Sequence, residues 1–254
     1  MLALIGIGLD AKDISVKALE FIKAADIVLS ESYTSFSGKG ALEFITDQTG
    51  KIAERTKRSD FEDNLKATVA RASHGSMAIL VIGDPLIATT HSIILEEAQH
   101  QGIGTAVFHA PSIFSAAIGE SGLDIYRFGP TTTVPFWSER YKPASFMDVI
   151  RRNLSNSQHT LVLLDIEQER RRPMGLNEAY ATICSADSKR IIEDKTPVIS
   201  LSAVGQADQH IALTAFSQLP IISRKCEGMA SSLIFPSKMN FAEQAATKKF
   251  RSNL

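Results

Sequence analysis

The stretch SMAILVIGDPLIATTHSIILEEAQHQG, residues 76–102, carries the pattern that decides the fold. An apolar run at 76–85 ends in the tripeptide Gly-Asp-Pro. After a short polar loop, residues 92–102 place apolar side chains at helical spacing and close on a glycine. A buried strand, a loop and a helix in this order predict one unit of a parallel sheet.

The same alternation extends to both sides of this stretch. Expected strands lie at 2–8, 26–32, 76–85, 105–111, 160–166, 196–205 and 231–237. Expected helices lie at 14–25, 66–75, 92–102, 112–123 and 176–184, with a further helical pattern at 185–193. These elements predict an α/β fold whose mostly parallel sheet has helices on both faces and binds ligands at the carboxyl ends of its strands.

A change in sequence texture near residues 109–113 predicts two domains. The N-terminal α/β domain, residues 1–110, should hold the mostly parallel sheet, and a C-terminal α/β domain should cover 111–254. Length alone allows one large domain or two small ones, and a chain of 254 residues is long enough to bury a sizeable core.

Composition excludes several classes of protein. The formal charge of −1 predicts neither a nucleic-acid nor a membrane partner. No apolar run approaches the roughly 20 residues of a membrane span, and the N-terminus has no signal-like pattern, so we expect a cytoplasmic protein. Cys184 and Cys226 are too few for a disulfide framework and fit buried free thiols, and the six histidines show no metal-ligand spacing, so no metal is expected.

The segment GIGLDA, residues 6–11, matches the dinucleotide-binding pattern G-x-G-x-x-A, and Glu31 supplies an acidic residue at the end of the next strand. Such a motif requires a helix that begins inside it, but here the helical pattern begins only at Ile14, with Asp13 as a candidate N-cap. A tight turn, a nucleotide site and another ligand site all remain open for this segment.

The Gly-Asp-Pro tripeptide predicts a ligand loop at the end of its strand. Gly83 lets a ligand approach the backbone, and Pro85 restricts Asp84 to extended or turn conformations. The Asp84 carboxylate suits an ammonium group or ribose hydroxyls, or it serves as a turn aspartate that accepts from nearby amides. Thr89 or Thr90 should cap the helix that follows, and His91 should pack or cap there.

Several collinear segments together resemble the diphthine synthases, a branch of the tetrapyrrole-methylase-like S-adenosylmethionine methyltransferases. GDPLIATTH (83–91), followed by HAPSIFSA (109–116), is the most specific pair. The other matching segments are GIGLDAKDISVKALE (6–20), ESYTS (31–35), SGLDIYRFG (121–129), HTLVLLDI (159–166) and LNEA (176–179). Beyond them, residues 236–240 replace the family's Pro-Gly-Lys-Leu-His pattern, while Glu243 still matches.

The resemblance implies two α/β domains with the cofactor cleft between them, in a homodimer. It implies that S-adenosyl-L-methionine, and its product S-adenosyl-L-homocysteine, contact residues spread over both domains. These are Leu9, Asp84, Ile87, Ser112, Ile113, Leu164, Val204 and Ser231. The implied reaction is repeated methylation of the amino group of 3-amino-3-carboxypropyl-histidine on elongation factor 2, in diphthamide biosynthesis.

No catalytic residue is assigned. The sulfonium is already electrophilic, and a neutral amine needs no nucleophile-activating triad. Tyr33, Thr34 and His109 are candidates for the cleft, where packing or a structural hydrogen bond is the favoured role of each. The alternatives are a superfamily methyltransferase acting on a tetrapyrrole or other small molecule, a cofactor-binding homologue without turnover, and, more distantly, an NAD-binding protein.

Overall fold

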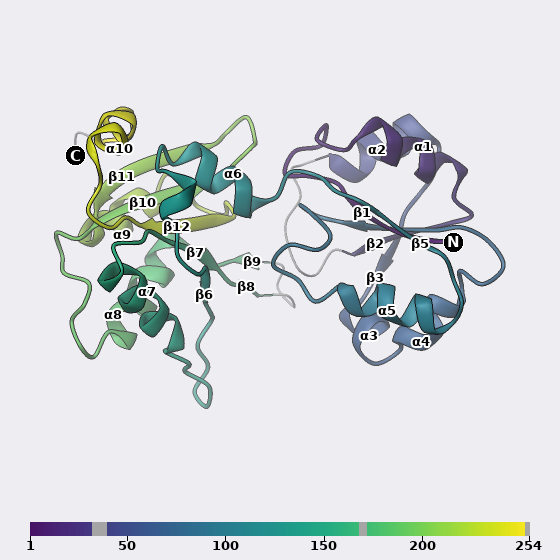
Figure 1. Cartoon of the computed structure of the whole chain (residues 1–254), viewed down its shortest axis with the longest axis horizontal. Helices are drawn as coiled ribbons and strands as arrows, with labels where there is room; N and C mark the ends of the chain where they lie inside the picture. The colour runs from purple at the N-terminus through teal and green to yellow at the C-terminus, as the bar shows by residue number, and fades with distance from the viewer. Residues whose placement is uncertain (32–39, 168–171, 252–254) are drawn as a thin grey trace. The chain divides into compact units, whose positions relative to one another are not determined.

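The computed structural model describes residues 1–31, 40–167 and 172–251. The chain divides into two compact units, Met1–Phe114 and Ser115–Leu254. Each unit is built around one five-stranded sheet (Figure 1). The predicted α/β fold class is therefore confirmed. Among the described residues, none of the helices combines the length and the apolarity needed to cross a membrane.

The sheet of the first unit is entirely parallel, with strand order β3-β2-β4-β1-β5. Its strands are β1 (Leu2–Gly6), β2 (Ile27–Glu31), β3 (Glu54–Thr56), β4 (Met77–Val81) and β5 (Thr105–Phe108). Strands β1 and β4 lie side by side at its centre and are buried along their whole length. Burial on both faces explains why they are continuous apolar runs rather than alternating ones.

Helices cover both faces of this sheet (Figure 1). One face carries α1 (Val16–Ala24) and α2 (Ala41–Thr49), and the other carries α3 (Arg58–Glu62), α4 (Leu65–Ala70) and α5 (Ser92–His100). Successive side chains of β1 enter the two cores in turn. Ala3 and Ile5 pack with the α1 and α2 residues, whereas Leu2 and Leu4 pack with those of α3 to α5.

The chain leaves β1 and β4 in opposite directions. From β1 it crosses through α1, on one face, to β2, and from β4 it crosses through α5, on the other face, to β5. Since β1 and β4 are neighbours, the loops after them diverge at the carboxyl edge of the sheet. This divergence is a topological switch point, the place where open α/β sheets bind ligands.

The sheet of the second unit is mixed, with strand order β11-β10-β12-β7-β6. Its strands are β6 (Thr132–Val134), β7 (Thr160–Leu164), β10 (Pro197–Ser202), β11 (His210–Ala215) and β12 (Ser231–Phe235). Only the β6–β7 pair is parallel among these described strands. A separate two-stranded ribbon consists of β8 (Ile166–Glu167) and β9 (Arg172–Pro173).

Five helices are described in this unit, and an apolar core joins three of them, the second to the fourth along the chain, to its sheet. The helices are α6 (Ile113–Glu120), which begins in the first unit, α7 (Ser145–Ser155), α8 (Leu176–Ala186), α9 (Leu219–Ser223) and α10 (Phe241–Thr247). Short 3-10 turns lie at η1 (Ile125–Arg127), η2 (Phe216–Gln218) and η3 (Lys248–Phe250). Ile150 of α7, Ile183 of α8 and Leu219 of α9 meet in the core.

Two local predictions are wrong in this unit. The helical pattern at 185–193 does not continue as a helix, because α8 ends at Ala186. The carboxylate of Asp187 instead accepts the backbone N–H groups of Ile191 and Ile192, at 3.0 and 2.7 Å, and turns the chain. The expectation of two buried thiols also fails, since Cys184 is exposed while Cys226 is buried.

Candidate cofactor site

The loops after β1 and β4 are tied together at the switch point. Gly8 and Gly83 form an antiparallel bridge: the N–H of Gly83 donates to the carbonyl of Gly8 at 2.9 Å, and the N–H of Gly8 donates back at 3.2 Å. The N–H of Ile7 also donates to the carbonyl of Val81, at 2.9 Å. Since these loops follow central strands, the bonds hold the two loops rigidly together at this edge of the sheet.

Glycine is required at two positions where these loops meet, Gly6 at the end of β1 and Gly8 in the loop after it. A side-chain carbon on Gly6 would lie 2.7 Å from the Gly83 carbonyl oxygen and 3.0 Å from Cβ of Ala110, so the three loops approach too closely for it. Gly8 has a φ of 78°, and a side-chain carbon there would collide with Asp13. Gly83 also has a positive φ of 72°, but a side-chain carbon there would make only ordinary contacts, the nearest to Cα of Ser112 at 3.9 Å.

The turn after β1 is closed by an aspartate and does not bind a dinucleotide in the expected way. One carboxylate oxygen of Asp13 accepts the N–H groups of both Leu9 and Asp10, each at 2.9 Å. These are amides that a pyrophosphate would need. Helix α1 begins only at Val16, and its N-cap is Ser15, so the prediction that Asp13 caps it is wrong. The dinucleotide interpretation of residues 6–11 therefore loses its structural basis.

Asp84 lies buried in the Gly-Asp-Pro loop, with 7% of its surface exposed. Its Oδ1 accepts the N–H of Leu86 at 3.0 Å. Its Oδ2 accepts the N–H of Ala110 at 3.3 Å and lies 2.8 Å from Nδ1 of His109. The carboxylate therefore joins the loop after β4 to the loop after β5. Three of the roughly four acceptor positions of a carboxylate are filled from within the chain.

The polar residues after the loop do not cap the next helix with their side chains. Helix α5 begins at Ser92, its N-cap is His91, and no side-chain cap is formed, so the prediction that Thr89 or Thr90 caps it is wrong. His91 is packed, as expected, with 3% exposed. Its Nε2 lies 3.9 Å from the buried Glu31 carboxylate. Burial lowers the pKa of His91, and the charge of Glu31 opposes that effect.

The remaining residues implied for the first unit gather at the same edge. Leu9 follows the Gly8–Gly83 bridge, and Ile87, 44% exposed, follows the Asp84 turn. Ser112, which is buried, and Ile113, which begins α6, follow the loop after β5. The candidates Tyr33 and Thr34 lie outside the described residues.

The residues implied for the second unit also lie together. Leu164 ends β7, Ser231 begins β12, and Val204 follows β10 by two positions. Antiparallel pairing places Ser231 beside Ser202, whose hydroxyl lies 2.7 Å from that of Ser231, and places Ser232 beside Leu163, the neighbour of Leu164. All three implied residues therefore occupy one end of the second sheet.

Backbone strain marks both of these edges. Four described residues other than glycine have a positive φ. Two of them are Ala88, at 56° in the loop after β4, and Ala203, at 49° directly after β10. Such conformations are costly for residues with a side chain, and they concentrate where function requires a fixed loop shape. The other two, Ser157 and Arg190, lie in loops away from these edges, so half of the strained positions fall where the implied residues lie.

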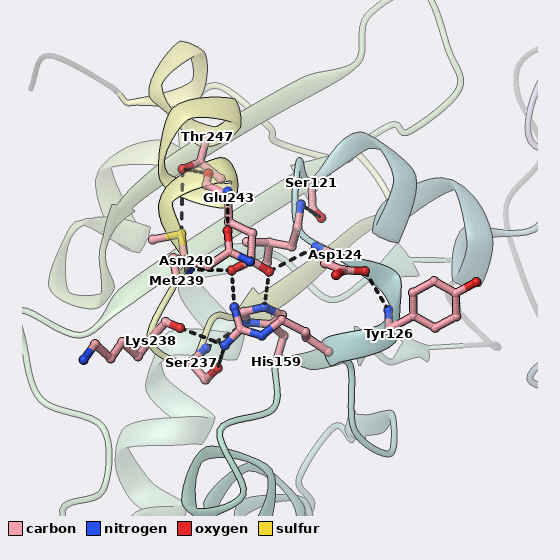
Figure 2. A network of polar contacts seen from close by, with 12 residues as sticks. Ser121, Asp124, Tyr126, His159, Ser237, Lys238, Met239, Asn240, Glu243 and Thr247 are labelled. Carbon is pink, nitrogen blue, oxygen red and sulfur yellow. Dashed lines mark hydrogen bonds and ion pairs between the residues drawn. The ribbon is translucent and has the colours of Figure 1, made fainter.

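A buried polar network occupies the opposite end of the second sheet (Figure 2). The side chain of Glu243 faces His159, and its Oε1 lies 2.9 Å from Nε2 of that ring. The other ring nitrogen accepts the N–H of Ser237 at 3.0 Å. Arg127 pairs with Glu243, whose carboxylate also accepts the N–H of Asp124. Sequence reasoning missed this network because its members are far apart in the chain.

The network explains where the divergent C-terminal segment lies. His159 precedes the first residue of β7, and β7 pairs with β12 so that Thr160 faces Phe235. Residues 236–240 follow that end of β12, whereas Leu164 and Ser231 mark the other. A five-residue strand spans about 13–17 Å. The segment that departs from the family pattern is therefore a strand length away from the implied cofactor residues.

The comparisons with known proteins agree with this architecture. The family profile described as Tetrapyrrole (Corrin/Porphyrin) Methylases matches residues 1–220. A diphthine synthase of Methanococcus maripaludis (strain C6 / ATCC BAA-1332) is 33% identical over 258 residues, which cover 100% of both chains. A diphthine methyl ester synthase of Mus musculus is 36% identical over 248 residues, covering 88% of this chain and 87% of that one.

A solved structure shows the same likeness in three dimensions. The crystal structure of a diphthine synthase superposes with a TM-score of 0.88 and 32% identity, covering 98% of this chain and 95% of the other. The chain belongs to the tetrapyrrole methylase family, and within that family to the diphthine synthases. It is accordingly an S-adenosylmethionine-dependent methyltransferase of diphthamide biosynthesis.

Proposed function

We propose that this methyltransferase transfers methyl groups from S-adenosyl-L-methionine to the amino group of 3-amino-3-carboxypropyl-histidine on elongation factor 2. The enzyme works on that protein in the cytoplasm, as a homodimer. The observation that carries the proposal is the buried Asp84 at the switch point of a chain whose relatives are diphthine synthases. Repeated transfer to one nitrogen is part of the proposal.

The cofactor is proposed to contact both described edges. At the first edge the contacts are Leu9, Asp84, Ile87, Ser112 and Ile113, and at the second they are Leu164, Val204 and Ser231. The residues fit such a ligand, because Asp84 keeps one acceptor position for a ribose hydroxyl or an ammonium group. The half-exposed Ile87 offers an apolar surface.

The chain needs few chemical groups for this reaction. When bound, S-adenosylmethionine supplies an electrophilic methyl group. An α-amino group has a reference pKa of about 7.7–8.0, so a useful fraction is neutral near pH 7. The task of the protein is to align the two reactants, and such alignment lowers the activation barrier by up to roughly 7–11 kcal/mol. The bridge between Gly8 and Gly83 and the bonds of Asp84 provide the rigidity that such alignment requires.

Calorimetry with S-adenosylhomocysteine tests the cofactor part of the proposal. We expect a single binding event that is weakened in the Asp84→Ala variant. The Asp47→Ala variant, at an exposed position of α2 in the same unit, is the matched control and should bind like the wild type. The absence of binding at millimolar ligand would contradict the proposal.

The acceptor is tested separately. Elongation factor 2 bearing the aminocarboxypropyl-histidine should gain methyl groups, and a tetrapyrrole should not. Methylation of the tetrapyrrole alone would favour the superfamily alternative. Cofactor binding without methylation of either acceptor would favour a homologue that has lost turnover.

A further inference from the structure

We propose that His109 accepts the proton that the substrate amine loses before each methyl transfer, and that Asp84 orients the His109 ring for this role. The inference rests on the proposed function, because it concerns the amine of that acceptor. It assigns a catalytic role to one residue of the HAPSI segment and a second, positioning role to Asp84.

The contact between the two side chains determines which ring nitrogen is free. Nδ1 of His109 lies 2.8 Å from Oδ2 of Asp84. The carboxylate is held by the N–H groups of Leu86 and Ala110, so it can only accept from the ring. Nδ1 therefore carries the hydrogen, and Nε2 keeps its lone pair. This is the arrangement by which a carboxylate fixes the tautomer of a general-base histidine.

Burial divides the pair into a fixed part and an accessible part. Asp84 is 7% exposed, while 67% of the His109 side chain is exposed. Among the described residues, Asp84 is the charged group that contacts the His109 ring, and Lys17 of α1 lies over the neighbouring Phe108 ring, 5.9 Å from its centroid. A side chain this exposed can meet a substrate nitrogen through Nε2 and later release the proton to water.

His109 also lies among the implied cofactor residues. It directly follows β5, whose neighbour is β1, and its own neighbour Ala110 lies so close to Gly6 that a side-chain carbon there would be 3.0 Å from Cβ of Ala110. Three residues further on, Ser112 and Ile113 complete that edge. A proton acceptor here lies at the edge where the methyl group is proposed to be transferred.

The proposed step balances for every round. An N–H bond of the substrate ammonium breaks and its proton passes to Nε2 of His109. The electron pair left on nitrogen forms the new bond to the methyl carbon, while the carbon–sulfur bond breaks and sulfur keeps that pair. His109 then gives the proton to solvent, so each methyl group transferred releases one proton.

The test uses a substitution that keeps the link to Asp84. In His109→Asn, the side-chain amide replaces Nδ1 as the donor, but nothing replaces Nε2. We expect kcat for methylation of elongation factor 2 to fall by about five- to tenfold at pH 7, because only the fraction of the amine that is already neutral can then react. The affinity for S-adenosylhomocysteine should stay within about twofold, and the loss in kcat should shrink above pH 8, where the free amine predominates.

His74→Asn is the matched control, because His74 is an exposed histidine just before β4, at the opposite edge of the same sheet. It should leave kcat unchanged. A second readout needs no activity: long-range ¹H–¹⁵N spectra of the wild type should show neutral His109 protonated on Nδ1. The opposite tautomer would contradict the proposal.

The remaining outcomes are also decisive. A kcat for His109→Asn within twofold of the wild type overturns the role of His109 alone. A loss of S-adenosylhomocysteine affinity in this variant overturns it as well, because His109 would then hold the cofactor. A wild-type enzyme that methylates no elongation factor 2 overturns the proposed function and this inference together.

Discussion

Asp84 shows how one residue serves both fold and site. The sequence left two roles open for it, a ligand contact and a turn aspartate. The structure demonstrates the turn role, since the carboxylate accepts the N–H groups of Leu86 and Ala110. That role does not compete with ligand binding, because the same bonds fix the carboxylate at the switch point.

Removal of the Asp84 carboxylate should therefore weaken cofactor binding. Asp84→Ala removes the proposed charged contact to the cofactor, which should weaken binding by about 1–3 kcal/mol. It also leaves the N–H groups of Leu86 and Ala110 without the carboxylate that accepts them. We expect S-adenosylhomocysteine affinity to fall by that amount in calorimetry, with the free energy of unfolding measured in parallel. An unchanged affinity would remove Asp84 from the site.

A substitution of Gly6 tests how closely the loops after β1, β4 and β5 pack together. In Gly6→Ala, the new methyl group would lie 2.7 Å from the Gly83 carbonyl oxygen and 2.9 Å from Cδ of Pro85. Overpacking of this kind costs about 1–3 kcal/mol, which urea denaturation can measure. Gly104→Ala is the control, because no heavy atom lies within 4 Å of its added carbon. Equal stability of the two variants would show that the loops move apart freely.

At the scale of elements, the sequence predicted the helices and strands whose apolar pattern is complete within one short stretch of chain. The central strands β1 and β4 are uninterrupted apolar runs, and both were predicted, β1 two residues too long and β4 five residues too long. Helix α7 was missed although its buried Phe146, Ile150 and Asn153 recur at helical spacing, so a stricter search for periodicity would find it. Short edge strands such as β3 carry too little pattern to be recognised.

The arrangement of elements was harder to predict. Antiparallel pairing in the second sheet depends on residues far apart, such as Ser200 of β10 and Leu233 of β12. The same limit hid the contact between His109 and Asp84, which are 25 positions apart. The candidate site could be located through the family resemblance, whereas its internal hydrogen bonds required the structure.

The network around α10 predicts a loss of stability in acid. Burial lowers the pKa of His159, against the opposing effect of Glu243. A lowered pKa means that the unfolded chain binds the proton more readily than the folded chain does. The contribution of neutral His159 to the free energy of unfolding is therefore complete above the reference pKa of about 6.5, and it is lost as the pH falls below that value. Urea denaturation between pH 7 and 5 should show this decrease.

A substitution separates the effect of His159 on stability in acid from the effects of the other histidines. His159→Gln should be less stable at pH 7 and lose less stability on acidification than the wild type. His74→Gln, at an exposed position, should keep the wild-type pH dependence. Identical pH dependence in His159→Gln and the wild type would contradict the assignment.

For the whole molecule, two differently built sheets each carry, at one edge, residues that the family resemblance implies for the cofactor. In the parallel sheet this edge is the switch point, and in the mixed sheet it is formed by the ends of β7, β10 and β12. The divergent segment 236–240 lies at the other end of the mixed sheet, so its divergence leaves the implied cofactor residues intact. We therefore expect an active enzyme rather than a binding homologue without turnover.

Methyl transfer to elongation factor 2 tests this account most directly. The purified chain, S-adenosylmethionine and elongation factor 2 bearing aminocarboxypropyl-histidine are incubated, and tandem mass spectrometry locates the methyl groups. The account predicts one or more methyl groups on the amino nitrogen of that histidine extension, with S-adenosylhomocysteine formed in equal amount. An unmodified extension, in a preparation that binds S-adenosylhomocysteine, would contradict it.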